Sequence, residues 1–218
     1  MNFDSRTIHN FLNDQEIELI ERVIRDTRSD DNTHYDNKND SGHNAVIHSF
    51  HLDHPWYQEI ANVLIPKFHQ HFGQDISLDT THILNAYVPY GVHTDVMSAE
   101  FDPNGSREAA WTFIIPLDNY QSHTLVFAQQ HNTIKTLARW IEETQPTPHA
   151  INDELHQRYL THIDRLDLQY LDVEDIFSWR KGSLFAASRR KFHTSDDFPG
   201  HGLACKRAII IWSTVPKS

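Results

Sequence analysis

Residues 82–95 read HILNAYVPYGVHTD, a stretch that joins an expected β-strand to a pair of potential metal ligands. Its first half is rich in β-branched and aromatic residues and runs into the turn sequence VPYG, which is typical of a strand and its end. His93 and Asp95 follow the turn, and in an extended chain residues two apart point to the same side. The stretch therefore predicts a strand end where an imidazole and a carboxylate can share one metal ion, the alternative being an ordinary turn histidine.

The same His-x-Asp triplet occurs at two other places, His51-Leu-Asp53 and His162-Ile-Asp164. The second of these lies in the expected helix 152–166, where side chains two apart are separated by about 200° and cannot easily share a metal. Asp53 precedes an expected helix start, where a carboxylate is best used as an N-cap. The extended context of the first triplet makes it the candidate metal site.

A third ligand must come from a strand that is distant in sequence. Two histidines and one carboxylate on one face of Fe(II) form a facial triad that leaves positions open for other ligands. His193 follows the expected strand 183–188 and would complete such a triad. Fourteen residues later, Arg207 begins a strand in which it alternates with Ile209 and Ile211, and we expect this face to be the interior of a barrel. An arginine buried there needs an anionic partner, such as a bound carboxylate.

Short β-branched and aromatic runs dominate the chain after Gly73, whereas the first 73 residues are mostly helical in pattern. Helices followed by antiparallel strands predict a mainly β protein with flanking helices, a jelly-roll barrel or double-stranded β-helix. We expect one domain over residues 1–218, with a helical insert at about 129–179. The expected helices are 13–27, 53–73, 132–144 and 152–166; the expected strands are 45–51, 82–88, 111–117, 124–128, 183–188 and 206–214; and 29–44 is expected to be a mobile loop.

Composition excludes several classes of protein. The chain has 218 residues and a formal net charge of −11, which argues against nucleic acid as a partner. Cys205 is the single cysteine, so no intramolecular disulfide can form. The sequence has no run of 18 apolar residues and no signal-peptide pattern at its start. We expect a cytoplasmic protein with no membrane partner.

The order Tyr87-x-Pro89-x-Gly91-x-His93-x-Asp95, followed by His193 and Arg207, resembles the Fe(II)/2-oxoglutarate-dependent oxygenases, most closely their prolyl 4-hydroxylase-like branch. The likeness covers about residues 7–128 and 180–215. It implies a double-stranded β-helix in which Fe(II) is held by His93, Asp95 and His193. It also implies 2-oxoglutarate and O2 as cosubstrates, with release of succinate and CO2. Since Asp95 fills the position that is a small residue in related halogenases, hydroxylation is the expected outcome.

The resemblance also assigns residues to 2-oxoglutarate. Arg207 would pair with its far carboxylate, and Tyr87, Asn85 and Ser213 are further candidates for contacts to it. Relatives in this branch often use lysine instead; Lys206 is adjacent, but it would face away from the barrel if Arg207 faces in. A second departure is that QSHTL (121–125) lacks the usual Gly-Gly pair of the middle strands.

Two other functions fit the same pattern. A cupin-type metal enzyme would keep the metal without 2-oxoglutarate, and a non-enzymatic jelly-roll binding module would need neither. For the oxygenase, a small metabolite, a free amino acid or a peptidyl side chain all suit the sequence as substrate.

Overall fold

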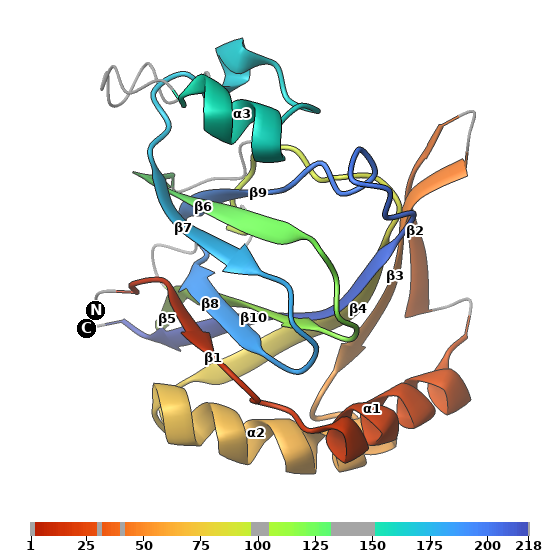
Figure 1. Ribbon diagram of the computed structural model, residues 1–218. Helices are drawn as coiled ribbons and strands as arrows, with labels where there is room; N and C mark the ends of the chain where they lie inside the picture. The colour runs from red at the N-terminus through yellow and green to blue at the C-terminus, as the bar shows by residue number, and fades with distance from the viewer. Residues whose placement is uncertain (1–2, 30–31, 40–41, 97–104, 132–150, 218) are drawn as a thin grey trace.

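The computed structural model describes residues 3–29, 32–39, 42–96, 105–131 and 151–217, whose strands form two antiparallel sheets (Figure 1). The larger sheet has seven strands in the order β1-β8-β5-β10-β4-β3-β2, and the smaller has three in the order β7-β6-β9. The strands are β1 (Arg6–Ile8), β2 (Thr33–Asn39), β3 (Gly42–His51), β4 (Ser77–Ala86), β5 (Arg107–Pro116), β6 (His123–Gln130), β7 (Val173–Ser178), β8 (Leu184–Ser188), β9 (Lys191–Ser195) and β10 (Lys206–Pro216). This arrangement confirms the predicted mainly β, jelly-roll-like fold.

Helices α1 (Asp14–Thr27) and α2 (Gln58–Phe72) lie against the outer face of the large sheet (Figure 1). Asn13 caps α1 in a reciprocal capping box with Glu16, as its position in the sequence predicts. Helix α2 follows a 3-10 turn, Pro55–Tyr57, and ends at Gly73, whose φ of +91° suits glycine. Both helices pack their apolar faces onto the sheet in the largest core cluster of the described residues.

Both faces of strand β10 are buried, each by a different partner. Ile209 and Ile211 belong to the core cluster shared with α1 and α2. Ala208 belongs to the cluster between the two sheets, against which Ile210 also packs. Since side chains alternate along a strand, the face that carries Ile209 and Ile211 is the helix-covered face, and Lys206 lies on the interior side with Ala208 and Ile210.

The small sheet is covered on its outer face by α3 (Asp153–Tyr159) and by a 3-10 turn, Arg165–Leu168 (Figure 1). Tyr159 and Leu160 pack there against Leu125, Phe127 and Phe192. The layers are therefore helices, large sheet, small sheet and a short helix, with a candidate cavity between the sheets. None of the helices in the described segments is long and apolar enough to cross a membrane.

Three expectations about local structure are wrong. Residues 29–44 are not a loop throughout, because β2 pairs with β3 in an antiparallel hairpin. The insert at about 129–179 is not wholly helical, because β7 lies within it and pairs with β6. Helix α3 is shorter than the predicted 152–166, so that His162 lies in a turn. The predicted helix 132–144 falls outside the described residues.

Gly182, which precedes β8, is in close backbone contact with Leu12 of the N-terminal segment. Its φ is +70°, and a Cβ built there would lie 2.2 Å from the backbone oxygen of Leu12. Its own carbonyl accepts a 2.8 Å hydrogen bond from the Leu12 amide, so the segments around Leu12 and Gly182 cannot separate without losing this bond. We expect Gly182→Ala to lower the free energy of unfolding by about 2 kcal/mol or more, as measured by urea denaturation.

Gly91→Ala is the matched control for this prediction. Gly91 has no positive φ, and an added Cβ would meet nothing within 4 Å. Its free energy of unfolding should stay within about 0.5 kcal/mol of the wild type. Equal destabilisation by both substitutions would show that the close approach at Gly182 does not control stability.

Candidate metal centre

Two segments that are 100 residues apart meet at one backbone bridge and bring three candidate ligands together. His93 and His193 exchange backbone hydrogen bonds of 3.1 and 2.9 Å, which ties the segment after β4 to the edge of β9. Across this bridge the Asp95 carboxylate lies 3.7 Å from Nε2 of His93 and 3.3 Å from Nε2 of His193. The ligand atoms of the three residues all lie within 4.8 Å of one another. This is the geometry that the extended reading of residues 93–95 predicts.

The backbone fixes which nitrogen each histidine presents. Nδ1 of His93 lies 2.7 Å from the carbonyl of Gly91, and Nδ1 of His193 lies 3.2 Å from the carbonyl of Lys191. A ring nitrogen can only donate to a carbonyl, so each Nδ1 carries a proton, and in the neutral ring each Nε2 then presents a lone pair. Both lone pairs are available to the shared centre, as in metal-ligating histidines whose other nitrogen is held by a carbonyl.

Asp95 is held from two sides. The hydroxyl of Thr112 on β5 donates to its carboxylate at 2.5 Å. The guanidinium of Arg189, which is fully buried, donates to the Asp95 backbone carbonyl from Nη2 at 2.8 Å and from Nε at 3.1 Å. These contacts fix the backbone and one carboxylate oxygen, so the orientation of Asp95 does not depend on a bound ion.

Electrostatics favour the metal-ligating form of Asp95 and of His93, but not of His193. Burial alone would raise the pKa of Asp95, but His193, His93 and the Thr112 hydrogen bond together hold that pKa well below its usual range. Burial and the neighbouring charge of His193 lower the pKa of His93. For His193, burial acts to lower the pKa, but Asp95 raises it above the ordinary value. One carboxylate and two imidazole nitrogens suit Fe(II).

The cluster lies on the wall of a cavity of about 580 Å³ between the two sheets. The interior faces of β4, β5 and β10 also line this cavity and supply mostly apolar residues, Leu84, Ile114 and Ile210 among them. A cavity of this size is typical of small-molecule sites in proteins. The three candidate ligands His93, Asp95 and His193 therefore face a space that can hold further ligands.

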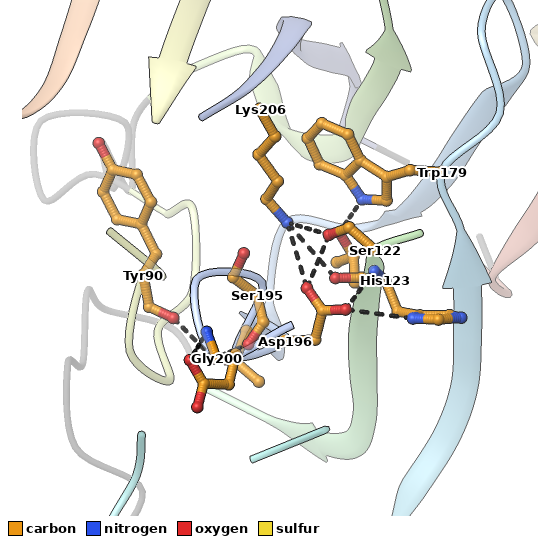
Figure 2. A network of polar contacts seen from close by, with 11 residues as sticks. Tyr90, Ser122, His123, Trp179, Ser195, Asp196, Gly200 and Lys206 are labelled. Atoms are coloured by element: carbon orange, nitrogen blue, oxygen red, sulfur yellow. Dashed lines mark hydrogen bonds and ion pairs between the residues drawn. The ribbon is translucent and has the colours of Figure 1, made fainter. Parts of the chain in front are cut away.

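Lys206 supplies a positive charge to the same cavity. Its side chain is 3% exposed and extends from β10 toward Ser122 and Asp196 (Figure 2). Its ammonium nitrogen lies 3.1 Å from the Ser122 hydroxyl and 4.1 Å from the centre of the Trp179 ring. Burial lowers the pKa of Lys206 to about 7, although Asp196 acts in the opposite direction.

The expectation that Arg207 faces the barrel interior is wrong. Arg207 points to the helix side of the sheet, where its guanidinium pairs with Glu21 on α1 and with Asp118. The reason is that both faces of β10 carry branched apolar residues, so Ile209 and Ile211 mark the helix-covered face and not the cavity. Lys206, one residue earlier, takes the place predicted for Arg207.

The other three residues predicted for 2-oxoglutarate also lie outside the cavity lining. Asn85 is opposite Arg207 in the β4–β10 register and shares its face. Tyr87 is 44% exposed, and the cavity is instead lined by Tyr90. Ser213 is buried, but its hydroxyl is hydrogen-bonded to the backbone of Trp111. Their predicted contacts to 2-oxoglutarate are therefore not supported by position.

Neither of the other two His-x-Asp triplets belongs to a converging group of three ligands among the described residues. Within the described part of the chain, His93, Asp95 and His193 are the one group of three metal-type ligands that converge. Asp164 caps a 3-10 turn by accepting from the Leu166 amide, which occupies its carboxylate. Asp53 does not cap the following turn as predicted, because His54 takes that position.

No model of a known protein family matches this sequence, and no curated protein matches it significantly. Solved structures do match its fold. The epimerase SnoN, in complex with Fe3+, alpha-ketoglutarate and nogalamycin RO, is 13% identical with a TM-score of 0.57, over 97% of this chain and 78% of that chain. The alpha-ketoglutarate-dependent carbocyclase SnoK is 12% identical with a TM-score of 0.55, over 98% and 80%. A 2OG-Fe(II) oxygenase-family protein from Burkholderia pseudomallei is 11% identical with a TM-score of 0.53, over 97% and 84%.

These matches confirm the predicted fold: this chain has the architecture of 2-oxoglutarate-dependent non-haem iron enzymes. The matched proteins include an epimerase and a carbocyclase. The shared fold therefore does not by itself specify the outcome of a reaction. The closer assignment to a prolyl 4-hydroxylase-like branch stays a prediction.

The geometry of the cluster predicts the effect of removing one ligand. His93→Ala or His193→Ala should each abolish tight Fe(II) binding, because two remaining ligands cannot hold the ion at the site. Thr112→Val should weaken Fe(II) binding by about 10- to 100-fold through loss of the hydrogen bond that orients Asp95. Anaerobic equilibrium dialysis measures Fe(II) binding, and circular dichroism shows whether the fold is kept.

His51→Ala is the control for the iron prediction, since His51 lies at the end of β3 in another His-x-Asp triplet. It should bind Fe(II) as the wild type does. Loss of Fe(II) in this variant, or wild-type affinity in His93→Ala, would show that the metal is held elsewhere.

Proposed function

We propose that this protein is an Fe(II)- and 2-oxoglutarate-dependent dioxygenase. The observation that carries the proposal is one cavity that contains both a His-Asp-His ligand cluster and a buried lysine. The cluster suits Fe(II), and the lysine suits the far carboxylate of a dicarboxylate cosubstrate. The fold shared with known enzymes of this kind supports the same assignment.

In this proposal His93, Asp95 and His193 hold the metal. Fe(II) bound there would supply the activation of O2 that couples oxidation of a substrate to conversion of 2-oxoglutarate into succinate and CO2. The Nδ1–H bonds to Gly91 and Lys191 keep both imidazoles in the ligating tautomer throughout. Thr112 holds the Asp95 carboxylate in place, so that the three ligands are preorganised before any ion binds.

Lys206 takes the role that the sequence suggested for Arg207. Its ammonium lies at the interior end of β10 and would pair with the far carboxylate of 2-oxoglutarate. Thr124 is placed to assist. Its hydroxyl lines the cavity and accepts a 2.9 Å hydrogen bond from the Trp179 indole, which leaves its own proton free to donate to a carboxylate oxygen.

The substrate is a small molecule or an apolar side chain in this proposal, and the expected outcome is hydroxylation. The cavity is also lined by apolar residues such as Ile47, Leu84 and Trp212, which favour an apolar group beside the metal. Asp95 supplies the carboxylate ligand, so no protein position at the metal is left open for a halide. In the balanced reaction one oxygen atom of O2 enters the substrate and the other enters succinate.

The two rival functions leave features without a task. A cupin-type enzyme that does not use 2-oxoglutarate has no need of a lysine buried in the metal cavity. A binding module has no need of three converging ligands with fixed tautomers, whose burial is costly without a bound ion.

Succinate formation tests the proposed function directly. We expect the protein, supplied with Fe(II), ascorbate, O2 and 2-oxoglutarate, to release succinate slowly even without its prime substrate. His193→Ala should release none, because it lacks the metal. If the wild type neither forms succinate nor binds 2-oxoglutarate in its anaerobic Fe(II) form, the proposal is wrong.

The two neighbouring cations of β10 give a sharper comparison. Lys206→Ala should weaken 2-oxoglutarate binding by about 30-fold or more, since losing one partner of a buried charge pair costs roughly 2–5 kcal/mol. Arg207→Ala removes ion pairs with Glu21 and Asp118 at the surface and should change the affinity by less than about threefold. Titration of the metal-to-ligand charge-transfer band under anaerobic conditions measures both. The opposite ranking would return the role to Arg207.

A further inference from the structure

Asp196, three residues beyond His193 in the sequence, is a fully buried carboxylate beside the ammonium of Lys206 (Figure 2). It accepts hydrogen bonds from the Ser122 hydroxyl at 2.7 Å, from the His123 amide at 2.7 Å and from the His123 ring at 3.1 Å. Burial would raise the pKa of Asp196, but these bonds and Lys206 hold it below its ordinary value. The carboxylate is therefore ionised and fixed in position.

The same group approaches the ammonium of Lys206 by two routes. One is direct, with 3.7 Å between Nζ of Lys206 and Oδ1 of Asp196. The other passes through Ser122, whose hydroxyl accepts from Nζ at 3.1 Å and donates to Asp196. The His123 carbonyl, 3.5 Å from Nζ, also accepts from the Asp196 amide. Lys206 is thus surrounded by acceptors whose positions Asp196 determines.

We propose that Asp196 is a positioning residue that keeps the buried Lys206 charged and aimed into the cavity, so that Lys206 can bind the far carboxylate of 2-oxoglutarate. The inference rests on the proposed function, because it concerns the cosubstrate site of that reaction. It assigns Asp196, with Ser122 and His123, to a task that the metal cluster does not perform. Asp196 acts through Lys206 and does not itself touch the cosubstrate.

The balance of forces makes this role testable. An ammonium placed between the rings of Trp179 and Phe198, at 4.1 and 4.9 Å, loses most of its hydration. Burial lowers the pKa of Lys206 to about 7 even with Asp196 beside it. Without the carboxylate that pKa would fall further, and neutral Lys206 could not pair with an anion. A simple count of charges gives the opposite expectation, since removing a negative charge should strengthen binding of a dianion.

The affinity for 2-oxoglutarate should depend on pH through the protonation of Lys206. Below about pH 7 Lys206 is protonated and the affinity for 2-oxoglutarate is at its highest. Above that value the affinity should fall by about tenfold for each pH unit, because binding must first return a proton to Lys206. The other titratable groups around this ammonium are His123, whose ring contacts Asp196, and His162, whose pKa is influenced by Lys206 and Asp196.

Asp196→Asn is the principal variant. Its affinity for 2-oxoglutarate, followed by calorimetry on the anaerobic Fe(II) protein, should be about tenfold weaker than wild type at pH 7.5. At pH 5.5 the difference should shrink to about twofold or less, or reverse, because Lys206 is then mostly protonated in both proteins. Such a shift of the profile is not expected from a purely structural defect. Tighter binding at every pH would show that Asp196 only competes for Lys206 and would overturn the proposal.

Asp197→Asn is the matched control, because it removes the same charge from the next residue. Asp197 accepts from Thr161 and from the Gly200 amide, and it does not contribute to the shift of the Lys206 pKa. Its pH profile should match the wild type. An equal shift in this variant would show that the effect is not specific to Asp196.

Lys206→Arg gives a second test that does not depend on how well Asp196→Asn folds. Since a guanidinium stays charged throughout, its affinity for 2-oxoglutarate should be constant from about pH 6 to 9. If the fall with pH persists there, or is abolished by His123→Asn or His162→Asn instead, Lys206 is not the titrating group and the proposal is wrong.

A direct titration separates this inference from the proposed function. The midpoint of Lys206, followed by NMR of its side-chain carbon, should be lower in Asp196→Asn than in the wild type by about one pH unit. An unchanged midpoint overturns the role of Asp196 whatever the enzyme does. A lowered midpoint in a protein that binds no 2-oxoglutarate at any pH supports the effect on Lys206 and contradicts the dioxygenase instead.

Discussion

Burial of both faces of the seven-stranded sheet is the constraint on which the site depends. One face is covered by α1 and α2, and the other faces the small sheet across the cavity. Each strand in the middle of the large sheet therefore carries one apolar face for the helices and a second face for the cavity. On β10 this places Ile209 and Ile211 against the helices and Lys206 at the cavity wall. Packing of the helices on one face of the large sheet thus holds its other face, which is the cavity wall, in place.

The convergence of the three candidate metal ligands depends on a second, smaller feature, the backbone bridge between His93 and His193. It joins the segment after β4 to the edge of the small sheet, so that ligands from distant parts of the chain face each other. Carbonyl groups then orient the imidazoles, and Thr112 and Arg189 orient Asp95. In this arrangement the positions of the ligands are determined by the protein before an ion is bound, which is what a facial triad requires.

The sequence alone predicts much of this site. The extended context of residues 93–95 is enough to select the triplet that converges with His193, because alternation in a strand brings His93 and Asp95 to one side. Histidine and carboxylate are distinctive ligand types, so His193 also stands out after its strand. The expected orientation of Arg207 is wrong for a physical reason: branched apolar residues occur on both faces of β10, and periodicity alone does not say which face the helices cover. The hairpin of β2 and β3 is missed because backbone pairing, and not local propensity, determines it. The network around Asp196 joins residues more than 70 positions apart, and no local pattern marks it.

The metal and cosubstrate sites can be tested together by a crystal structure of the protein grown without oxygen in the presence of Fe(II) and 2-oxoglutarate. We expect anomalous density for iron enclosed by Nε2 of His93, Nε2 of His193 and the carboxylate of Asp95. We also expect the far carboxylate of 2-oxoglutarate against the ammonium of Lys206, with Arg207 still paired to Glu21 on the helix side of the sheet. Iron bound at other residues, or a cosubstrate carboxylate held by Arg207, would contradict these two sites.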